Sequence, residues 1–204
     1  MEHDPPILLT IGHSNHTLED FIQLLKQHRV SAVADVRSHP YSRRLDHFNR
    51  EPLAAELQAA AIRYVFLGQE LGARREEADS YTGNQATYER VATLPEFQQG
   101  LQRLRHGARQ YRIVLMCAEK EPLDCHRTIL ICRQLRSEFR IQHILADGGL
   151  EEHQQTERRL VRQMGVTRTL FEPHLTEEDL IQQAYQQRGQ QIAYRAENEE
   201  GGEA

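Results

Sequence analysis

The residue types best suited to chemistry gather in one short segment, CAEKEPLDCHR, which runs from Cys117 to Arg127. A thiolate is a nucleophile as well as a metal ligand, and a histidine exchanges protons near neutral pH. We expect Cys125 to open a helix directly after Asp124 as its N-cap, where backbone N–H groups lower the pKa of a thiol. The segment therefore predicts a thiolate nucleophile, Cys125 or Cys117, with His126 as acid or base and Arg127 in an anion clamp.

Two other interpretations of this segment stay open. Cys117, Cys125 and His126, with His13 as a fourth ligand, could bind zinc or iron. Against this, the spacing of the two cysteines is not a standard zinc-finger spacing, and adjacent Cys and His side chains seldom both reach one ion. Alternatively, both cysteines are buried and structural, which is what we expect of Cys132 on an apolar helical face.

A second polar segment, DVRSHPYSRR, begins at Asp35 and ends one residue after Arg43. Arginines at the end of a strand can hold a phosphate or a carboxylate. We expect Arg37 and Arg43 to bind an anionic substrate and Asp35 to belong to the catalytic group. The alternative is a structural ion pair of Asp35 with Arg37.

Two further loops supply weaker signals. Gly12 lets the backbone approach a ligand closely, so the next two residues, His13 and Ser14, join the predicted site as catalytic and substrate-binding residues. A long polar segment at residues 68–84 is typical of a functional or mobile loop. Its Tyr81 could stack on a nucleobase, or pack at the rim of the site.

The elements that position these residues are predicted by five short apolar runs, at residues 7–11, 32–36, 63–67, 112–116 and 142–145. Continuous apolar runs indicate strands that are covered on both faces, and helical patterns lie between them. This alternation predicts a single α/β domain, a mainly parallel five-stranded sheet flanked by helices in a Rossmann-like three-layer sandwich. The reactive residues follow the strands, so they meet at the carboxyl edge of the sheet, where such folds bind ligands.

Helix starts are predicted from capping residues. Thr17 is the expected N-cap of the first helix, and Thr93 with Glu96 forms the pattern of a capping box. Further helices are expected at about 52–60 and after Gly149.

The chain divides into three parts. Residues 1–165 form the predicted core domain. Residues 166–194 form an extension that packs on the core or on a second subunit, and its helix is expected to start at Thr176. Residues 195–204 hold four glutamates and one arginine, which predicts a disordered acidic tail.

The composition excludes several classes of protein. The chain has 204 residues and a net charge of −5, and no apolar run approaches the roughly 20 residues that span a bilayer. The N-terminus lacks the pattern of a signal peptide, and three cysteines argue for a reducing compartment, so we expect a cytoplasmic protein without a membrane partner. P-loop, GxGxxG, HExxH and GxSxG motifs are absent. The arginine excess is best explained by compositional bias.

The combination of motifs resembles one known family. It is carried by TIGHS at 10–14, DVRS at 35–38, LGQELG at 67–72, LMCAE at 115–119 and CHR at 125–127. Over residues 7–165 the chain is similar to the bacterial and archaeal family named domain of unknown function 488. The resemblance implies a single cytoplasmic α/β domain and assigns no reaction. Ala73 departs from the family pattern, which has a second glycine there.

Three hypotheses about function follow. The first is an enzyme with a Cys/His/Arg site that acts on a small anionic substrate, such as a nucleotide or another phosphate-bearing molecule. The second is a non-catalytic nucleic-acid binding module that uses the arginine loops and Tyr81, although the near-neutral body of the chain counts against it. The third is a metal-binding protein that uses Cys117, Cys125 and His126. No particular cofactor is predicted, and a homodimer is an open expectation.

Overall fold

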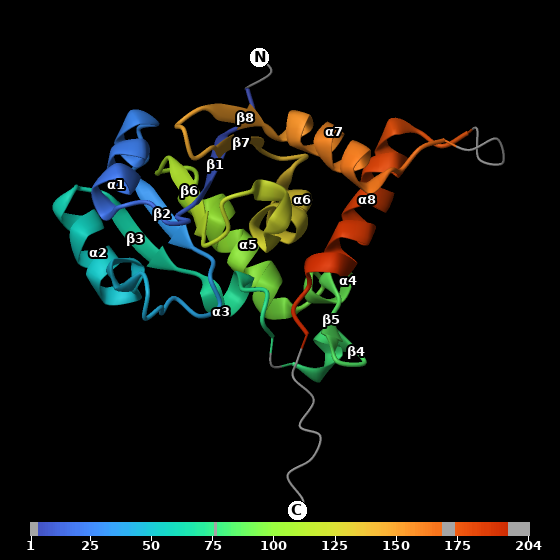
Figure 1. The fold of residues 1–204 in the computed structure, drawn as a ribbon, viewed down its shortest axis with the longest axis horizontal. Coiled ribbons are helices and arrows are strands. Elements are labelled where there is room, and N and C mark those ends of the chain that lie inside the picture. Colours follow the sequence, from blue (N-terminus) through green and yellow to red (C-terminus); the bar gives the residue numbers. More distant parts are fainter. Residues whose placement is uncertain (1–3, 76, 169–173, 196–204) are drawn as a thin grey trace, which may run out of the picture.

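The main sheet is the frame that places the candidate residues. The computed structural model describes residues 4–75, 77–168 and 174–195, so the predicted tail at 195–204 lies outside the described residues except for Arg195. The sheet has six strands in the order β3-β2-β6-β1-β7-β8, with helices on both faces (Figure 1). The predicted α/β fold with a mainly parallel sheet is confirmed.

The five predicted strands are all present and parallel to one another. They are β1 (Ile7–Gly12), β2 (Ala32–Asp35), β3 (Arg63–Phe66), β6 (Ile113–Cys117) and β7 (Arg140–Ile144). The sixth strand, β8 (Leu150–Glu152), pairs antiparallel with β7 after a tight turn that contains Gly148 at φ +83°. Sequence patterns miss β8 because three residues, two of them glutamates, carry no periodic signal.

Successive side chains of each strand point into two separate cores. Leu9, Val33 and Val114 pack against α1 (Leu18–Gln27) and α2 (Arg50–Ala59) on one face. On the opposite face, a larger core lies beneath the remaining long helices, which are α5 (Pro95–Gly107), α7 (His153–Met164) and α8 (Glu177–Ile192), and the short α6 (Arg133–Leu135). Both faces are therefore covered, which explains the continuous apolar runs.

The chain leaves neighbouring strands in opposite directions. After β1 and β2 it crosses to the face of α1 and α2, whereas after β6 it crosses to the face of α5 and α6. Because β6 lies between β1 and β2, the loops diverge on both sides of its carboxyl end. A topological switch point of this kind opens the crevice in which such folds bind ligands.

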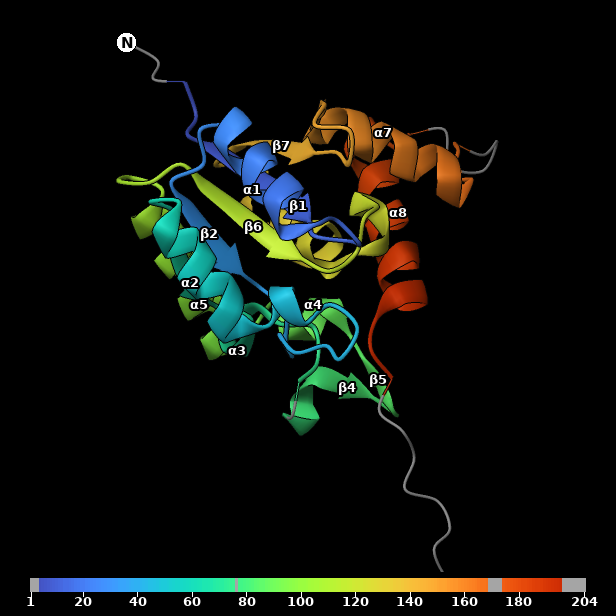
Figure 2. The same cartoon turned by 60° about the vertical axis from the view of Figure 1, so that its left-hand side comes forward.

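A smaller ribbon stands apart from the sheet. The strands β4 (Tyr81–Thr82) and β5 (Gln85–Ala86) pair antiparallel between α3 (Gly68–Leu71) and α4 (Tyr88–Val91). Figures 1 and 2 show this ribbon next to the chain that leaves α8, and Ala86 N–H donates to the carbonyl of Tyr194. No helix in the described part of the chain is long and apolar enough to cross a membrane.

The helix starts predicted at Thr17 and Thr176 are confirmed, and the one predicted at Thr93 is wrong. The Oγ1 of Thr17 caps α1 by accepting the N–H of Asp20, and the expected helix after Thr176 begins with a capping box. Thr93 does not cap α5, whose N-cap is Leu94, because Pro95 takes the first helical position with its preset φ.

A chain of buried hydrogen bonds ties α7 and α8 to the sheet. Tyr185 donates to Glu157, so its oxygen is free to accept Nε2–H of His153 at 3.0 Å. His153 Nδ1 then accepts Nε2–H of His143 at 2.9 Å, and His143 Nδ1 accepts the hydroxyl of Thr10 at 2.8 Å. This order uses both ring nitrogens of each histidine, which fixes both rings as neutral.

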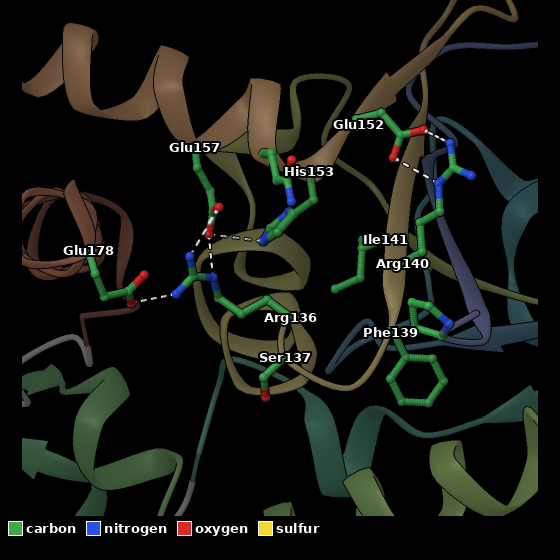
Figure 3. Close-up of a pocket in the computed structure, with 11 residues that line it drawn as sticks. Arg136, Ser137, Phe139, Arg140, Ile141, Glu152, His153, Glu157 and Glu178 are labelled. Atoms are coloured by element: carbon green, nitrogen blue, oxygen red, sulfur yellow. Dashed lines mark hydrogen bonds and ion pairs between the residues drawn. The ribbon is translucent and has the colours of Figure 1, made fainter. Parts of the chain in front are cut away.

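This chain of hydrogen bonds ends beside a cavity of about 740 Å³ between β7, α7 and α8. Figure 3 shows Arg136 there between Glu157 and Glu178, with His153 next to Glu157. On the far side of the cavity, Arg140 pairs with Glu152 of β8 (Figure 3). Each of these charged side chains has a partner within the protein. We therefore interpret the walls of the cavity as a structural joint, in which ion pairs connect α7 and α8 to the rest of the domain.

The neutral histidines predict how stability depends on pH. Burial, followed by the charge of Arg136, lowers the pKa of His153 to about 3, and burial also lowers the pKa of His143. As the pH decreases below about 6.5, the unfolded chain therefore binds protons at these histidines that the folded chain does not bind. The free energy of unfolding consequently decreases as the pH decreases. Between pH 7 and pH 5, His153 alone should cost about 2 kcal/mol of unfolding free energy.

Urea denaturation of wild type and His153→Gln at both pH values measures this cost. The substitution should remove about 2 kcal/mol of the difference between pH 7 and pH 5. His106→Gln, at an exposed position of α5, serves as the control and should leave the difference unchanged. Equal pH dependence in wild type and His153→Gln would show that the ring is not held neutral.

Candidate metal centre

Cys117 ends β6 in the middle of the sheet. Its side chain faces the core under α5 and α6, and it is 6% exposed. The loop after β1 continues beside it, because His13 N–H donates to the carbonyl of Cys117 and Ser14 N–H to that of Ala118, both at 2.9 Å. Gly12 is required there, since a Cβ on it would lie 1.8 Å from the carbonyl oxygen of Glu119.

The helix predicted to begin at Cys125 begins later. Residues Pro122–Asp124 form a 3₁₀ turn, Cys125 is extended, and a π-helical turn runs from Arg127 to Cys132. Asp124 is therefore not an N-cap, and it pairs with Arg188 of α8 instead. The predicted backbone donor is nevertheless present, because Arg127 N–H donates to Cys125 Sγ at 3.5 Å.

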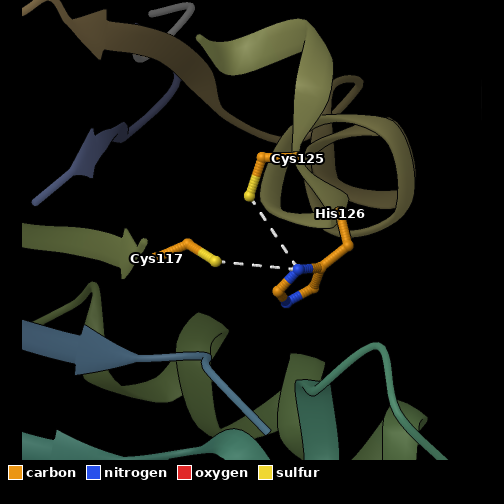
Figure 4. A group of neighbouring side chains, drawn as sticks. All are labelled: Cys117, Cys125 and His126. Carbon is orange, nitrogen blue, oxygen red and sulfur yellow. Dashed lines mark hydrogen bonds between the residues drawn. The ribbon is translucent and has the colours of Figure 1, made fainter. Parts of the chain in front are cut away.

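The change of backbone at this point aims two adjacent side chains at one place. Cys125 has φ −131° and ψ 139°, whereas His126 has φ −59° and ψ −25°. His126 Nδ1, the ring nitrogen nearest the backbone, lies 3.9 Å from Cys125 Sγ and 3.8 Å from Cys117 Sγ (Figure 4). The three ligand atoms all lie within 4.8 Å of one another. Adjacent Cys and His side chains seldom both reach one ion, but here their ligand atoms lie close enough together to do so.

The proton on His126 is placed by a carbonyl. Nε2 lies 3.0 Å from the oxygen of Val36, and a carbonyl can only accept, so Nε2 carries the hydrogen. In the neutral ring, Nδ1 then presents its lone pair toward the two sulfurs. Metal-bound histidines are oriented in this way, with the second nitrogen donating to a carbonyl or carboxylate.

The two thiols differ in acidity. Burial by itself raises the pKa of Cys125, but the hydrogen bond from Cys117 and the charge of Arg127 bring it well below its usual value. That same hydrogen bond, together with burial, raises the pKa of Cys117. Cys125 is therefore the more acidic of the two thiols.

Arg127 is turned away from solvent. Its side chain is completely buried, and Nη1 and Nη2 donate to the carbonyls of Glu119 and Lys120 at 2.6 and 3.3 Å. Nε is buried and without a hydrogen-bond partner. The predicted substrate-binding arginine thus holds the loop after Cys117 in the structure.

The Asp35–Arg37 pair, left open as functional or structural, is fully buried and joined by two hydrogen bonds of 2.9 and 2.7 Å. Asp35 also accepts the hydroxyl of Tyr64 at 2.7 Å, and Arg37 donates to the carbonyl of Phe48 at 2.8 Å and to His13 Nε2 at 3.2 Å. Most donors of Arg37 are consumed inside the protein, which leaves little for an external anion.

His13 lies next to the centre and does not join its ligand atoms. Burial, followed by the charge of Arg37, lowers its pKa to about 4, so the ring is neutral. Nε2 accepts from Arg37 and Nδ1 donates to the carbonyl of Ser14, while the ring stacks on Phe48 at 4.3 Å. Both nitrogens are used, which argues against His13 as the fourth ligand.

The remaining predicted residues lie outside the buried group. Ser14, at φ +47°, is half-buried and donates to the side chain of Asn15. Arg43 is exposed on the loop after β2. Tyr81 lies on the separate β4–β5 ribbon, where its hydroxyl donates to the carbonyl of Arg75 at 2.6 Å. Cys132 is fully buried in the core, as predicted.

Sequence reasoning missed the backbone groups that complete this region. The carbonyls of Val36 and Phe48 orient His126 and Arg37, and every residue type offers such a carbonyl, so no motif could reveal them. The hydrogen bond from the hydroxyl of Tyr64 to Asp35 likewise has no signal in the sequence.

Among the comparisons with known proteins, only the comparison with family models gave a match. Neither curated proteins nor solved structures gave a match. The model of the family described as Domain of unknown function DUF488 matches residues 17–133, which is more than half of the chain and includes both cysteines and the histidine of the centre. The chain therefore belongs to the DUF488 family.

Proposed function

We propose that the protein is a metal-dependent enzyme whose centre is one transition-metal ion bound by Cys117, Cys125 and His126. The observation that carries this proposal is the convergence of two sulfurs and an imidazole lone pair within 4.8 Å of one another. All three groups are less than one tenth exposed, and a shared ion would compensate the cost of burying the imidazole lone pair between two sulfurs.

The distances fit a tetrahedral ion. Zinc binds sulfur at about 2.3 Å and imidazole nitrogen at about 2.0–2.1 Å, so a tetrahedron separates sulfur from nitrogen by about 3.6 Å. The two sulfur–nitrogen distances of 3.8 and 3.9 Å need only small side-chain shifts to reach this value. Thiolate and imidazole ligands select zinc and similar soft ions over magnesium or calcium.

The ligand number favours catalysis over a structural role. Within the described residues, no fourth His, Cys, Asp or Glu belongs to the group. Structural zinc sites are closed by four protein ligands, whereas catalytic sites keep a position for water or substrate. Two thiolates neutralise a divalent ion, and the buried guanidinium of Arg127 nearby then favours an anionic fourth ligand.

A second candidate is the thiol enzyme expected from the sequence, with Cys125 as nucleophile toward an anionic substrate. The lowered pKa of Cys125 favours it. The burial of both thiols and the internal bonds of Arg37 and Arg127 favour the metal instead. All three cysteines are unpaired, which supports a reducing compartment such as the cytoplasm for either candidate.

The metal-free protein should bind one Zn²⁺ per chain, measured by competition with a coloured chelator. Cys117→Ala, Cys125→Ala and His126→Gln should each weaken binding by more than about 100-fold, since each loses a ligand rather than an outer-shell partner. The matched control is Cys132→Ala, a buried cysteine outside the group, which should bind zinc like wild type. Weak binding that is equal in all four variants would reject the centre.

Thiol reactivity separates the two candidates. In the metal-free protein at pH 7, iodoacetamide should modify Cys125 before Cys132, because burial raises the pKa of Cys132 while that of Cys125 is lowered. Peptide mass spectrometry identifies the site, and Zn²⁺ should protect Cys125. If all three thiols react only after unfolding, the thiol enzyme is excluded. If Cys125 reacts quickly with or without zinc, the metal proposal fails.

A further inference from the structure

We propose that Asp35 is a positioning residue of this centre, which sets the geometry of the metal ligands through Arg37 without contacting them. The proposal rests on the proposed function, since it concerns the same three ligands. It assigns the Asp35–Arg37 pair a role that neither substrate binding nor simple packing describes.

The carboxylate of Asp35 accepts all of its hydrogen bonds from groups within the protein. Oδ1 accepts the backbone N–H and the Nε–H of Arg37, and Oδ2 accepts Nη2–H of Arg37 and the hydroxyl of Tyr64. Among the described residues these are the partners of the carboxylate, which is completely buried. A carboxylate with four donors and no solvent holds its loop in one conformation.

The first ligand controlled by this loop is His126. Val36 lies between the two members of the pair, and its carbonyl accepts Nε2–H of His126 at 3.0 Å. The hydrogen bond from the backbone N–H of Arg37 to Oδ1 of Asp35, at 3.1 Å, closes a turn around Val36 and fixes the direction of that carbonyl. The orientation and the tautomer of the imidazole therefore depend on Asp35.

The second ligand controlled by the loop is Cys117. Arg37 donates from Nη1 to His13, and the backbone N–H of His13 donates to the carbonyl of Cys117. The pair thus joins the end of β1, and with it the end of β6, to the end of β2. Two ligands that are nine residues apart in the sequence, one at the end of β6 and one just before the π-helical turn, are held in register by one ion pair outside the centre.

Gly68 shows how tightly this loop is placed. A Cβ on Gly68 would lie 2.0 Å from the carbonyl oxygen of Arg37, so α3 packs directly against the loop. Movement of the loop toward Gly68 is blocked. A change at Asp35 must therefore be absorbed by the Val36 carbonyl and the His13 ring.

The test is Co²⁺ binding to metal-free protein, read by the visible absorption of the ion, which reports ligand type and geometry. Asp35→Asn keeps the size of the side chain but loses its charge and one acceptor. It should weaken Co²⁺ binding by about 10–100-fold, the effect of an outer-shell partner, and should shift the absorption bands. Tyr64→Phe removes a single hydrogen bond from the same carboxylate and should give a smaller change of the same kind.

The matched control is Glu157→Gln. Glu157 is also a buried carboxylate that accepts from an arginine, Arg136, and from a tyrosine hydroxyl, but it lies on α7 where this helix contacts α8. Its substitution should lower the unfolding free energy, measured with urea, and leave the Co²⁺ affinity and spectrum unchanged. The comparison separates a loss of stability from a loss of ligand geometry.

The outcomes are distinct. If wild type binds no Co²⁺, the proposed function itself fails. If wild type binds Co²⁺ but Asp35→Asn has the same affinity and spectrum, Asp35 is structural and only this inference falls. If Asp35→Asn does not fold, Tyr64→Phe decides, and an unchanged spectrum in that variant overturns the positioning role.

Discussion

The buried ion pair of Asp35 with Arg37 is the interaction on which the candidate centre depends. It lies where the chain leaves β2 for one face of the sheet, next to the place where it leaves β6 for the other face. A charge pair is retained in such a place only if its hydrogen bonds are nearly complete, and here the donors reach Phe48 and His13. The same bonds that compensate desolvation also fix three strand ends relative to one another.

The sequence predicts the parallel strands of the sheet better than it predicts where the helices begin. Five apolar runs were enough for the parallel strands, and the rule that ligands bind at the carboxyl edge brought Cys117, Cys125 and His126 together. The start of the helix near Asp124 could not be predicted from local patterns. Asp124 is a favourable N-cap residue, but its carboxylate pairs with Arg188, which is far away in the sequence. Long-range contacts of this kind leave no mark in local patterns.

The geometry of the centre was equally hidden from sequence. Spacing rules for zinc sites describe short loops that carry their own ligands, whereas here one sulfur ends a strand and the other precedes a π-helical turn. The arginines illustrate the same limit. Residue type suggested an anion clamp, but Arg127 is oriented toward the backbone carbonyls of Glu119 and Lys120, which only the fold reveals.

Two polar systems therefore serve different ends of one small domain. The histidine chain from Thr10 to Glu157 fastens α7 and α8, and the group around Asp35 fastens the strand ends at the switch point. Within the described residues, only the second lies beside three side chains whose potential metal-ligand atoms converge. This difference is why the function that we propose uses Cys117, Cys125 and His126 and not the cavity beside α7 and α8.

The central claim is that these three side chains bind one metal ion, and X-ray absorption at the zinc edge of the loaded protein tests it most directly. The account predicts two sulfur neighbours at about 2.3 Å and nitrogen or oxygen neighbours at about 2.0–2.1 Å, with an imidazole scattering pattern. A first shell of nitrogen and oxygen alone would place the zinc elsewhere and would contradict the account.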